Sequence, residues 1–144
     1  GRNRVDLTHV ENAAHAHLLA LEALTDKEHS GGKAYFISQD EPTLFWPWLN
    51  DLLHRLGEPR VTRKISFRTA YWMGFALECA WKILRRKNDP PMTRFVANQL
   101  AKDHWFDGSA AERDLGYKPI VSMEDGLKET VAWLKSETTE EASG

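Results

Sequence analysis

The spacing of the histidines is the first feature of this 144-residue chain that could suggest metal binding. His15 and His17 lie two positions apart, so on a helix they point toward different faces, whereas a helical ligand pair needs a spacing of three or four. We therefore interpret His9, His15 and His17 as surface or hydrogen-bonded groups, and His54 and His104 have no evident partner. No metal-ligating residue is predicted.

Glycine and cysteine spacing also limits the cofactor chemistry of this chain. A dinucleotide loop needs a glycine-rich turn from a strand into a helix, so that the pyrophosphate meets the helix N-terminus. The nine glycines contain no Gly-x-Gly-x-x-Gly spacing, and Gly31-Gly32 precede Lys33 and an apolar run. The single cysteine, Cys79, excludes an internal disulfide and a cysteine-built zinc site. No cofactor-binding residue is predicted.

The bulk composition is that of a soluble globular chain. Hydrophobic residues make up 42% and charged residues 28% of the sequence, and the formal net charge is -2. This near-balance gives no reason to expect a nucleic-acid partner. The N-terminal segment matches neither a signal peptide nor a transit peptide and looks like the middle of a protein. We therefore expect a cytoplasmic protein, with peripheral attachment to a membrane surface left open.

Hydrophobic periodicity and capping residues predict helices at 11–24, 44–56, 67–86, 93–102, 109–116 and 122–135. Thr8 and Glu11 form a capping-box pattern before the first helix. Short strands are expected at 5–7, 34–38 and 60–65, with an extended piece at 104–106. The tail at 136–144 is expected to be disordered.

Strands that alternate with helices predict an α/β protein. The almost wholly apolar run at 34–38 is typical of a parallel strand that is covered on both faces. Two or three short strands cannot form a self-sufficient sheet, so this strand needs neighbours from other polypeptide. The expected organisation is the end of a Rossmann-like domain at 1–42, a mostly helical region at 43–135 and the tail.

Three segments carry a resemblance to a known family. The first contains Val10, Asn12, Ala16-His17 and Ala20, and the second runs from Gly32 through Pro42 to Phe45-Trp46. The third contains Phe106-Asp107, Leu115-Gly116-Tyr117-Lys118-Pro119, Ser122 to Leu127, and Trp133. Together they resemble the C-terminal part of the 3β-hydroxysteroid dehydrogenase/isomerase family, a branch of the extended short-chain dehydrogenases. The match covers about residues 5–135; Ala110 departs from it, because the family often has Lys there.

The resemblance implies a last Rossmann strand and helices followed by a small, mostly helical substrate domain. It implies an N-terminal Rossmann domain that binds NAD or NADP, a Ser/Tyr/Lys catalytic set, and an apolar steroid, sterol or similar lipidic substrate with a 3-hydroxy or 3-oxo group. The family's catalytic Tyr has Lys four residues on, but Tyr35, Tyr71 and Tyr117 have Gln39, Phe75 and Val121 at that spacing. No catalytic residue is therefore predicted here, and the chain alone is expected to be inactive. The alternative is a non-catalytic helical module that contacts protein or membrane.

The segment after the first strand is the best candidate for touching substrate, because ligands of doubly wound folds bind beyond the carboxyl ends of strands. Its candidate residues are Leu7, Thr8, His9, Val10 and Asn12. The alternative interpretation is that Thr8 and Asn12 only cap and tie the turn.

The helix at 67–86 places Trp72 and Phe75 on the same side as several charged residues. Three interpretations of this face remain open. It could pack against the missing Rossmann domain or a loop, or form a lid over an apolar substrate. It could also insert shallowly into a membrane surface, with the basic stretch 85–87 near anionic headgroups. Arg68, Glu78 and Lys82 interrupt the apolar run, which argues against a transmembrane span. A homo-oligomer also remains open.

Overall fold

The computed structural model describes residues 1–25, 31–39 and 41–141. Most of the described chain is helical. The helices are α1 (Val10–Thr25), α2 (Phe45–Leu56), α3 (Phe67–Ile83), α4 (Arg94–Ala101), α5 (Ser109–Leu115) and α6 (Met123–Glu141). The strands are β1 (Arg4–Val5) and β2 (Thr43–Leu44).

The small sheet joins segments that are far apart in the sequence. β1 pairs antiparallel with β2, and Val5 also forms a parallel bridge to His104. The amide of His104 donates to the carbonyl of Arg4 at 2.8 Å, and the amide of Asp6 donates to the carbonyl of His104 at 3.0 Å. The strand predicted at 5–7 is thus present but shorter and shifted by one residue, and the extended piece at 104–106 pairs with it through His104.

The predictions of strands at 34–38 and 60–65 are wrong for this structure, because neither segment is assigned as a strand. A strand is defined by its pairing with another strand, and in the described part of the chain neither segment is assigned to a sheet. The two segments differ in surroundings. Residues 60–65 are exposed throughout, whereas Tyr35 and Ile37 are half-buried and Ser38 is buried. The segment at 34–38 therefore lies on a core without belonging to a sheet.

That core is small and lies where α1 meets α5. Ala16, Ala111 and Tyr117 form its buried centre, and the half-buried Tyr35 and Ile37 pack against it. The Tyr117 hydroxyl donates to the carbonyl of Ser38 at 3.1 Å, so the phenol stays bonded although it is buried. The core thus holds the segment at 34–38 against the two helices.

Most helix limits agree with the predictions, and glycine in the left-handed region ends α2 and α5. Gly57 and Gly116 have φ angles of 82° and 65°. α3 stops three residues early, because Arg85 takes a left-handed φ of 48°. The disordered tail predicted from 136 is wrong as far as 141, since α6 continues to Glu141 and an established helix extends at low cost. Residues 142–144 lie outside the described part.

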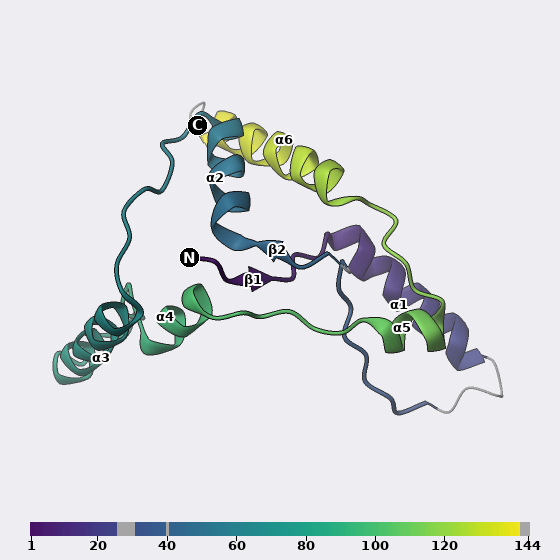
Figure 1. The fold of residues 1–144 in the computed structure, drawn as a ribbon, viewed down its shortest axis with the longest axis horizontal. Coiled ribbons are helices and arrows are strands. Elements are labelled where there is room, and N and C mark those ends of the chain that lie inside the picture. The colour runs from purple at the N-terminus through teal and green to yellow at the C-terminus, as the bar shows by residue number, and fades with distance from the viewer. Residues whose placement is uncertain (26–30, 40, 142–144) are drawn as a thin grey trace.

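The whole arrangement is open. Figure 1 shows an arch in which α3 and α4 lie at one end, α1 and α5 at the other, and α2 and α6 beside the small sheet between them. The chain exposes 10869 Å², whereas a compact monomer of its mass should expose about 7,500 Å². Part of the excess is apolar, because Leu18, Leu21 and Leu24 of α1 are each at least 60% exposed.

Candidate functional site

A partly open pocket of about 320 Å³ lies between the N-terminal end of α1, α2 and α6. Its first wall consists of Leu7, Thr8, His9 and Val10, four of the five residues predicted to touch substrate. They come together because the chain leaves β1 and turns into α1 at this point. A volume of this order is at the lower end for small-molecule sites.

The opposite wall comes mainly from α6. It consists of Ser122, Met123, Gly126, Leu127, Thr130 and Trp133, with Trp48 from α2 and Gln39 beside them. Sequence reasoning did not assign these residues to a site, because periodicity shows which face of a helix is apolar but not which element faces it. Gly126 was one available signal, since a glycine inside a helix costs stability and usually has a packing reason.

Gly126 allows the two walls to approach each other. A Cβ atom at this position would lie 3.0 Å from Cδ2 of His9, so any side chain would press on the imidazole. The Nε2 atom of His9 lies 3.3 Å from a carboxylate oxygen of Glu129 on α6. Among the described residues that line the pocket, only His9 has a buried side-chain polar atom, Nδ1, without a hydrogen-bond partner. The imidazole is thus placed between the two walls.

Asn12 does not line the pocket but lies behind it. Its Nδ2 atom donates to Oε1 of Gln39 at 2.8 Å and to the carbonyl of Val121 at 2.9 Å. Its Oδ1 atom accepts from the amides of Ile120 and Val121, both at 2.8 Å. Asn12 is fully buried, so it ties α1 to the segment that leads into α6 and to Gln39 of the pocket wall.

Thr8 lines the pocket without capping α1. The helix starts at Val10, and the carbonyl of His9 accepts its first helical bond from Ala13 at 3.1 Å. The hydroxyl of Thr8 instead donates to the carbonyl of Ile37 at 3.4 Å. The capping box predicted for Thr8 and Glu11 is therefore wrong, because the helix begins one residue later than that motif requires.

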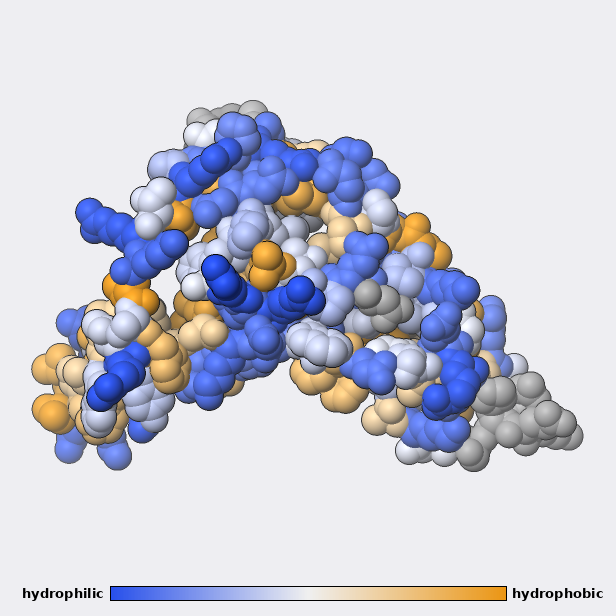
Figure 2. All heavy atoms as spheres, in the orientation of Figure 1, coloured by the Kyte–Doolittle hydropathy of each residue, from blue (hydrophilic) through white to orange (hydrophobic). Residues whose placement is uncertain are grey.

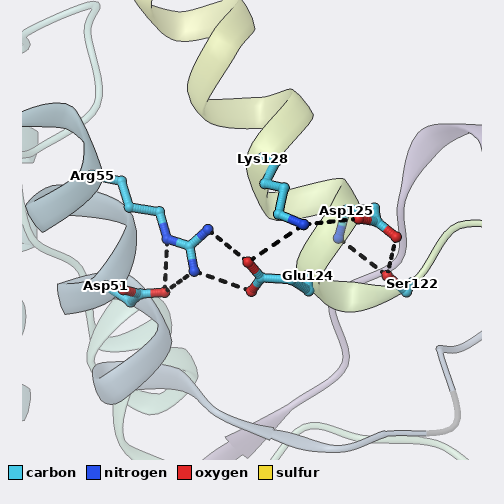
Figure 3. A network of polar contacts seen from close by, with 6 residues as sticks. All are labelled: Asp51, Arg55, Ser122, Glu124, Asp125 and Lys128. Carbon is cyan, nitrogen blue, oxygen red and sulfur yellow. Dashed lines mark hydrogen bonds and ion pairs between the residues drawn. The ribbon is translucent and has the colours of Figure 1, made fainter.

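A network of charges fixes α2 against α6 beside the pocket. Figure 3 shows Arg55 of α2 between Asp51 and Glu124, with its guanidinium nitrogens 3.0 and 3.1 Å from the two oxygens of Glu124. The hydrogen bond from Arg55 holds the pKa of Glu124 below its ordinary value. Lys128 extends the network, at 3.8 Å from Glu124 and 3.1 Å from Asp125.

The start of α6, next to this network, is capped by Ser122 as predicted. The Ser122 hydroxyl oxygen accepts from the amide of Asp125 at 3.1 Å, and the hydroxyl donates to the Asp125 carboxylate at 2.7 Å. This hydrogen bond, with Lys128 beside it, lowers the pKa of Asp125. A second hollow of about 360 Å³ adjoins the pocket here, with Glu41, Asp51 and Glu124 on its wall. The pocket thus opens next to an acidic surface.

Trp72 and Phe75 do not lie at the pocket. They belong to α3, where Trp72 is 62% exposed, and their rings meet edge to face with centroids 5.7 Å apart. The guanidinium of Arg94 lies 5.1 Å from the centre of the Phe75 ring. In the described part of the chain, α3 packs closely with α4 alone. The structure therefore brings the two groups of predicted contact residues to different ends of the molecule.

The remaining chemical groups to consider among the described residues are the Tyr35 hydroxyl and the metal-ligating side chains. The hydroxyl of Tyr35 donates to Asp114 at 3.2 Å, and Asp114 also pairs with Lys33 at 3.1 Å. Within residues 1–25, 31–39 and 41–141, no three metal-ligating side chains gather in one place. Over the same residues, no helix has the length and apolarity needed to cross a bilayer.

Comparison with known proteins identifies the class. The profile of the 3-beta hydroxysteroid dehydrogenase/isomerase family matches residues 1–68. A 2-alkyl-3-oxoalkanoate reductase of Stenotrophomonas maltophilia is 49% identical over 89% of this chain and 39% of its own length. A reductase of the same name from Shewanella oneidensis is 46% identical over 90% of this chain and 34% of its own.

More distant relatives have sterol names. The mouse sterol-4-alpha-carboxylate 3-dehydrogenase, decarboxylating, is 32% identical over 91% of this chain and 37% of its own length. No solved structure matches the chain significantly. These matches fit a C-terminal part of a member of the 3-beta hydroxysteroid dehydrogenase/isomerase family. It spans 34–39% of the length of the two reductases, and all three relatives are named as oxidoreductases.

Proposed function

We propose that this chain forms the substrate side of an NAD(P)-dependent oxidoreductase that acts on the 3-hydroxy or 3-oxo group of a bulky lipidic substrate. The observation that carries the proposal is the pocket between the start of α1 and α6, which four of the five residues predicted from sequence line. Leu7, Val10, Met123, Leu127 and Trp133 supply an apolar wall for the body of such a substrate.

The names of the relatives narrow the substrate. The 2-alkyl-3-oxoalkanoate reductases and the sterol-4-alpha-carboxylate 3-dehydrogenases act on molecules with an oxygen function at carbon 3 and a carboxylate on the neighbouring carbon. Both names also describe hydrocarbon attached to this unit, which is alkyl in the first and a sterol skeleton in the second. Because identity is greater to the reductases, a 2-alkyl-3-oxoalkanoate is the first substrate to test.

Cofactor and catalytic groups would come from a Rossmann domain outside this chain. Two surfaces support such a partner. The segment at 34–38 lies on the core without being assigned to a sheet, and Leu18, Leu21 and Leu24 of α1 are exposed. A parallel sheet laid against them would cover both, since strands of such sheets are buried on two faces.

The test compares the 144-residue chain with a longer polypeptide that includes the family's remaining length. The longer protein should oxidise NADH or NADPH when a 2-alkyl-3-oxoalkanoate is added, and the chain alone should show no turnover. In the longer protein, Leu127→Ala should raise KM for the alkyl substrate, whereas the control Trp105→Ala, outside the pocket, should not. Turnover by the chain alone, or equal effects of the two substitutions, would contradict the proposal.

A second candidate is a non-catalytic module, which the isolated position of α3 and α4 favours. It predicts that the longer polypeptide binds neither NADH nor NADPH. Equilibrium dialysis with each nucleotide distinguishes the two candidates without a substrate.

A further inference from the structure

The pocket between α1 and α6 has charges around it but none of the strong ions on its wall. Among the described residues, the twelve that line it include no Lys, Arg, Asp or Glu. Half of the twelve have apolar side chains, and the volume of about 320 Å³ leaves room for a hydrocarbon chain. A carboxylate in such a space would lose its water shell without meeting a cation, whereas hydrocarbon gains by leaving water.

The hydroxyl and amide side chains on the wall are already bonded within the chain. The hydroxyl of Thr130 donates to the carbonyl of Gly126, one turn back on α6, at 2.8 Å. The hydroxyls of Thr8 and Ser122 donate to a backbone carbonyl and to a carboxylate, and the amide of Gln39 donates to another carbonyl. These groups hold the wall in place, so a ligand would compete with the chain for them.

The remaining polar side-chain atoms on the wall offer no free positive charge. Nε2 of His9 lies 3.3 Å from a carboxylate oxygen of Glu129, so this acid already pairs with any charge on the ring. Nδ1 of His9 is buried without a partner and therefore does not face the open part of the pocket. The indole N–H groups of Trp48 and Trp133 are neutral donors. Within the described residues, the wall thus has no side chain that could neutralise an anion.

Glu129 lies at the rim of the pocket. It is three residues after Gly126 and four before Trp133, so on α6 it shares a face with these two lining residues. Its side chain is 57% exposed, and its contact with His9 places the carboxylate beside the first wall as well. An anion that entered here would approach a like charge, and the repulsion is strongest where little water lies between the two.

The adjoining hollow adds negative charge on the α2 side. It shares four lining residues with the pocket, Trp48 among them, and its wall carries Glu41, Asp51 and Glu124. Arg55 lies beside it, but Asp51 and Glu124 both bind its guanidinium (Figure 3). Figure 2 shows hydrophilic residues predominating over the part of the molecule that α2 and α6 occupy in Figure 1. An apolar interior is thus surrounded by a charged rim.

We infer that this pocket holds an uncharged hydrocarbon branch of the substrate, and that Glu129 is a specificity-determining residue that keeps carboxylates out of it. The inference rests on the proposed function and adds a direction to it. Hydrocarbon occupies the space between α1 and α6, whereas the carboxylate and the oxygen function at carbon 3 lie beyond the rim. There they meet the cofactor and the catalytic groups that come from outside this chain.

Binding of decanol and decanoate to the 144-residue chain tests this preference without catalysis. The two probes have similar hydrocarbon chains and differ in charge, and tryptophan fluorescence reports binding because Trp48 and Trp133 line the pocket. Decanol should bind at least about tenfold more tightly at neutral pH, since burial of an unpaired carboxylate is costly. Leu127→Ala should weaken decanol binding, whereas Trp105→Ala, outside the pocket, should not. Decanoate that binds as tightly as decanol, or decanol that does not bind, overturns the inference.

Glu129→Gln tests the rim carboxylate, because it removes the charge and keeps an oxygen that can accept from His9. At about 0.1 M salt, where the screening length is about 10 Å, decanoate should bind at least about threefold more tightly to this variant, with decanol unchanged. The matched control is Glu137→Gln, which changes the net charge equally but lies about 12 Å farther along α6. It should leave both affinities unchanged. Equal gains from the two substitutions would reveal a general effect of net charge and overturn the role of Glu129.

Turnover separates this inference from the proposed function. A longer polypeptide that prefers decanol to decanoate yet reduces no 2-alkyl-3-oxoalkanoate counts against the proposed function and supports the preference of the pocket for hydrocarbon. Turnover together with equal binding of the two probes overturns the inference alone.

Discussion

The side-chain amide of Asn12 donates to the side-chain oxygen of Gln39 over 2.8 Å, and both residues are almost completely buried. Gln39 in turn donates to the carbonyl of Val121 at 2.6 Å, which also accepts from Asn12. Two residues 27 positions apart thus share one acceptor ahead of α6. This arrangement sets the position of the pocket wall that Gln39 forms.

Asn12→Ala should therefore lower the free energy of unfolding by about 2–4 kcal/mol, because buried backbone groups of Ile120 and Val121 would lose their partner. Urea unfolding measures the change. Asn98→Ala removes an exposed amide hydrogen bond and should alter stability by no more than about 0.5 kcal/mol. If both substitutions lowered the free energy of unfolding equally, the buried hydrogen bonds of Asn12 would add no more stability than an exposed one.

Gly126→Ala should disturb the pocket more than the helix. Alanine favours a helix by about 1 kcal/mol over glycine, but its Cβ would displace the His9 ring by a few tenths of an ångström. In the longer polypeptide, KM for the 3-oxo substrate should rise by about tenfold or less while kcat changes little. The exposed position Ala132, changed to Ser, is the control. An unchanged KM would exclude the His9 side of the pocket from substrate binding.

Stability should fall in acid because of the contact between α2 and α6. The pKa of Glu124 is lowered in the folded chain, so its ion pair with Arg55 stabilises the fold fully above the ordinary value of 4.5. That contribution is lost as pH falls through the folded pKa, below 4.5. The urea midpoint of Glu124→Gln should lie below that of the unchanged chain at pH 7 and converge with it in strong acid. A constant difference across this range would contradict the assignment.

Gly74→Ala should destabilise the α3–α4 hairpin. A Cβ atom there would meet backbone atoms of Thr93 and Arg94 at 2.7–2.9 Å, so the helices would have to separate. The cost of overpacking exceeds the gain in helix propensity and leaves a net loss of about 1–2 kcal/mol. Cys79→Ala, on the exposed face of the same helix, should be nearly neutral. Hydrogen exchange of α3 and α4 amides would locate the effect in the hairpin.

The sequence predicted the helices well and the strands poorly, for one physical reason. The limits of α1, α2 and α4 follow from local periodicity and from residues such as Gly57, which needs only its own backbone to end a helix. A strand at 34–38 depends on a partner far away or absent, and no local pattern can supply one. The same limit applies to the pocket. Its first wall is one continuous segment, whereas Gly126 and Trp133 join it only through the packing of α6.

The segment at 34–38 also affects how the chain behaves when no Rossmann domain covers this segment. It is short, apolar and free of Lys or Pro, which are the residues that natural proteins place on edges to prevent unwanted pairing. Wherever this segment stays uncovered, its apolar side chains would favour association with other chains, or capture by chaperones and removal by proteases. Covering it is therefore a requirement for accumulation in a cell.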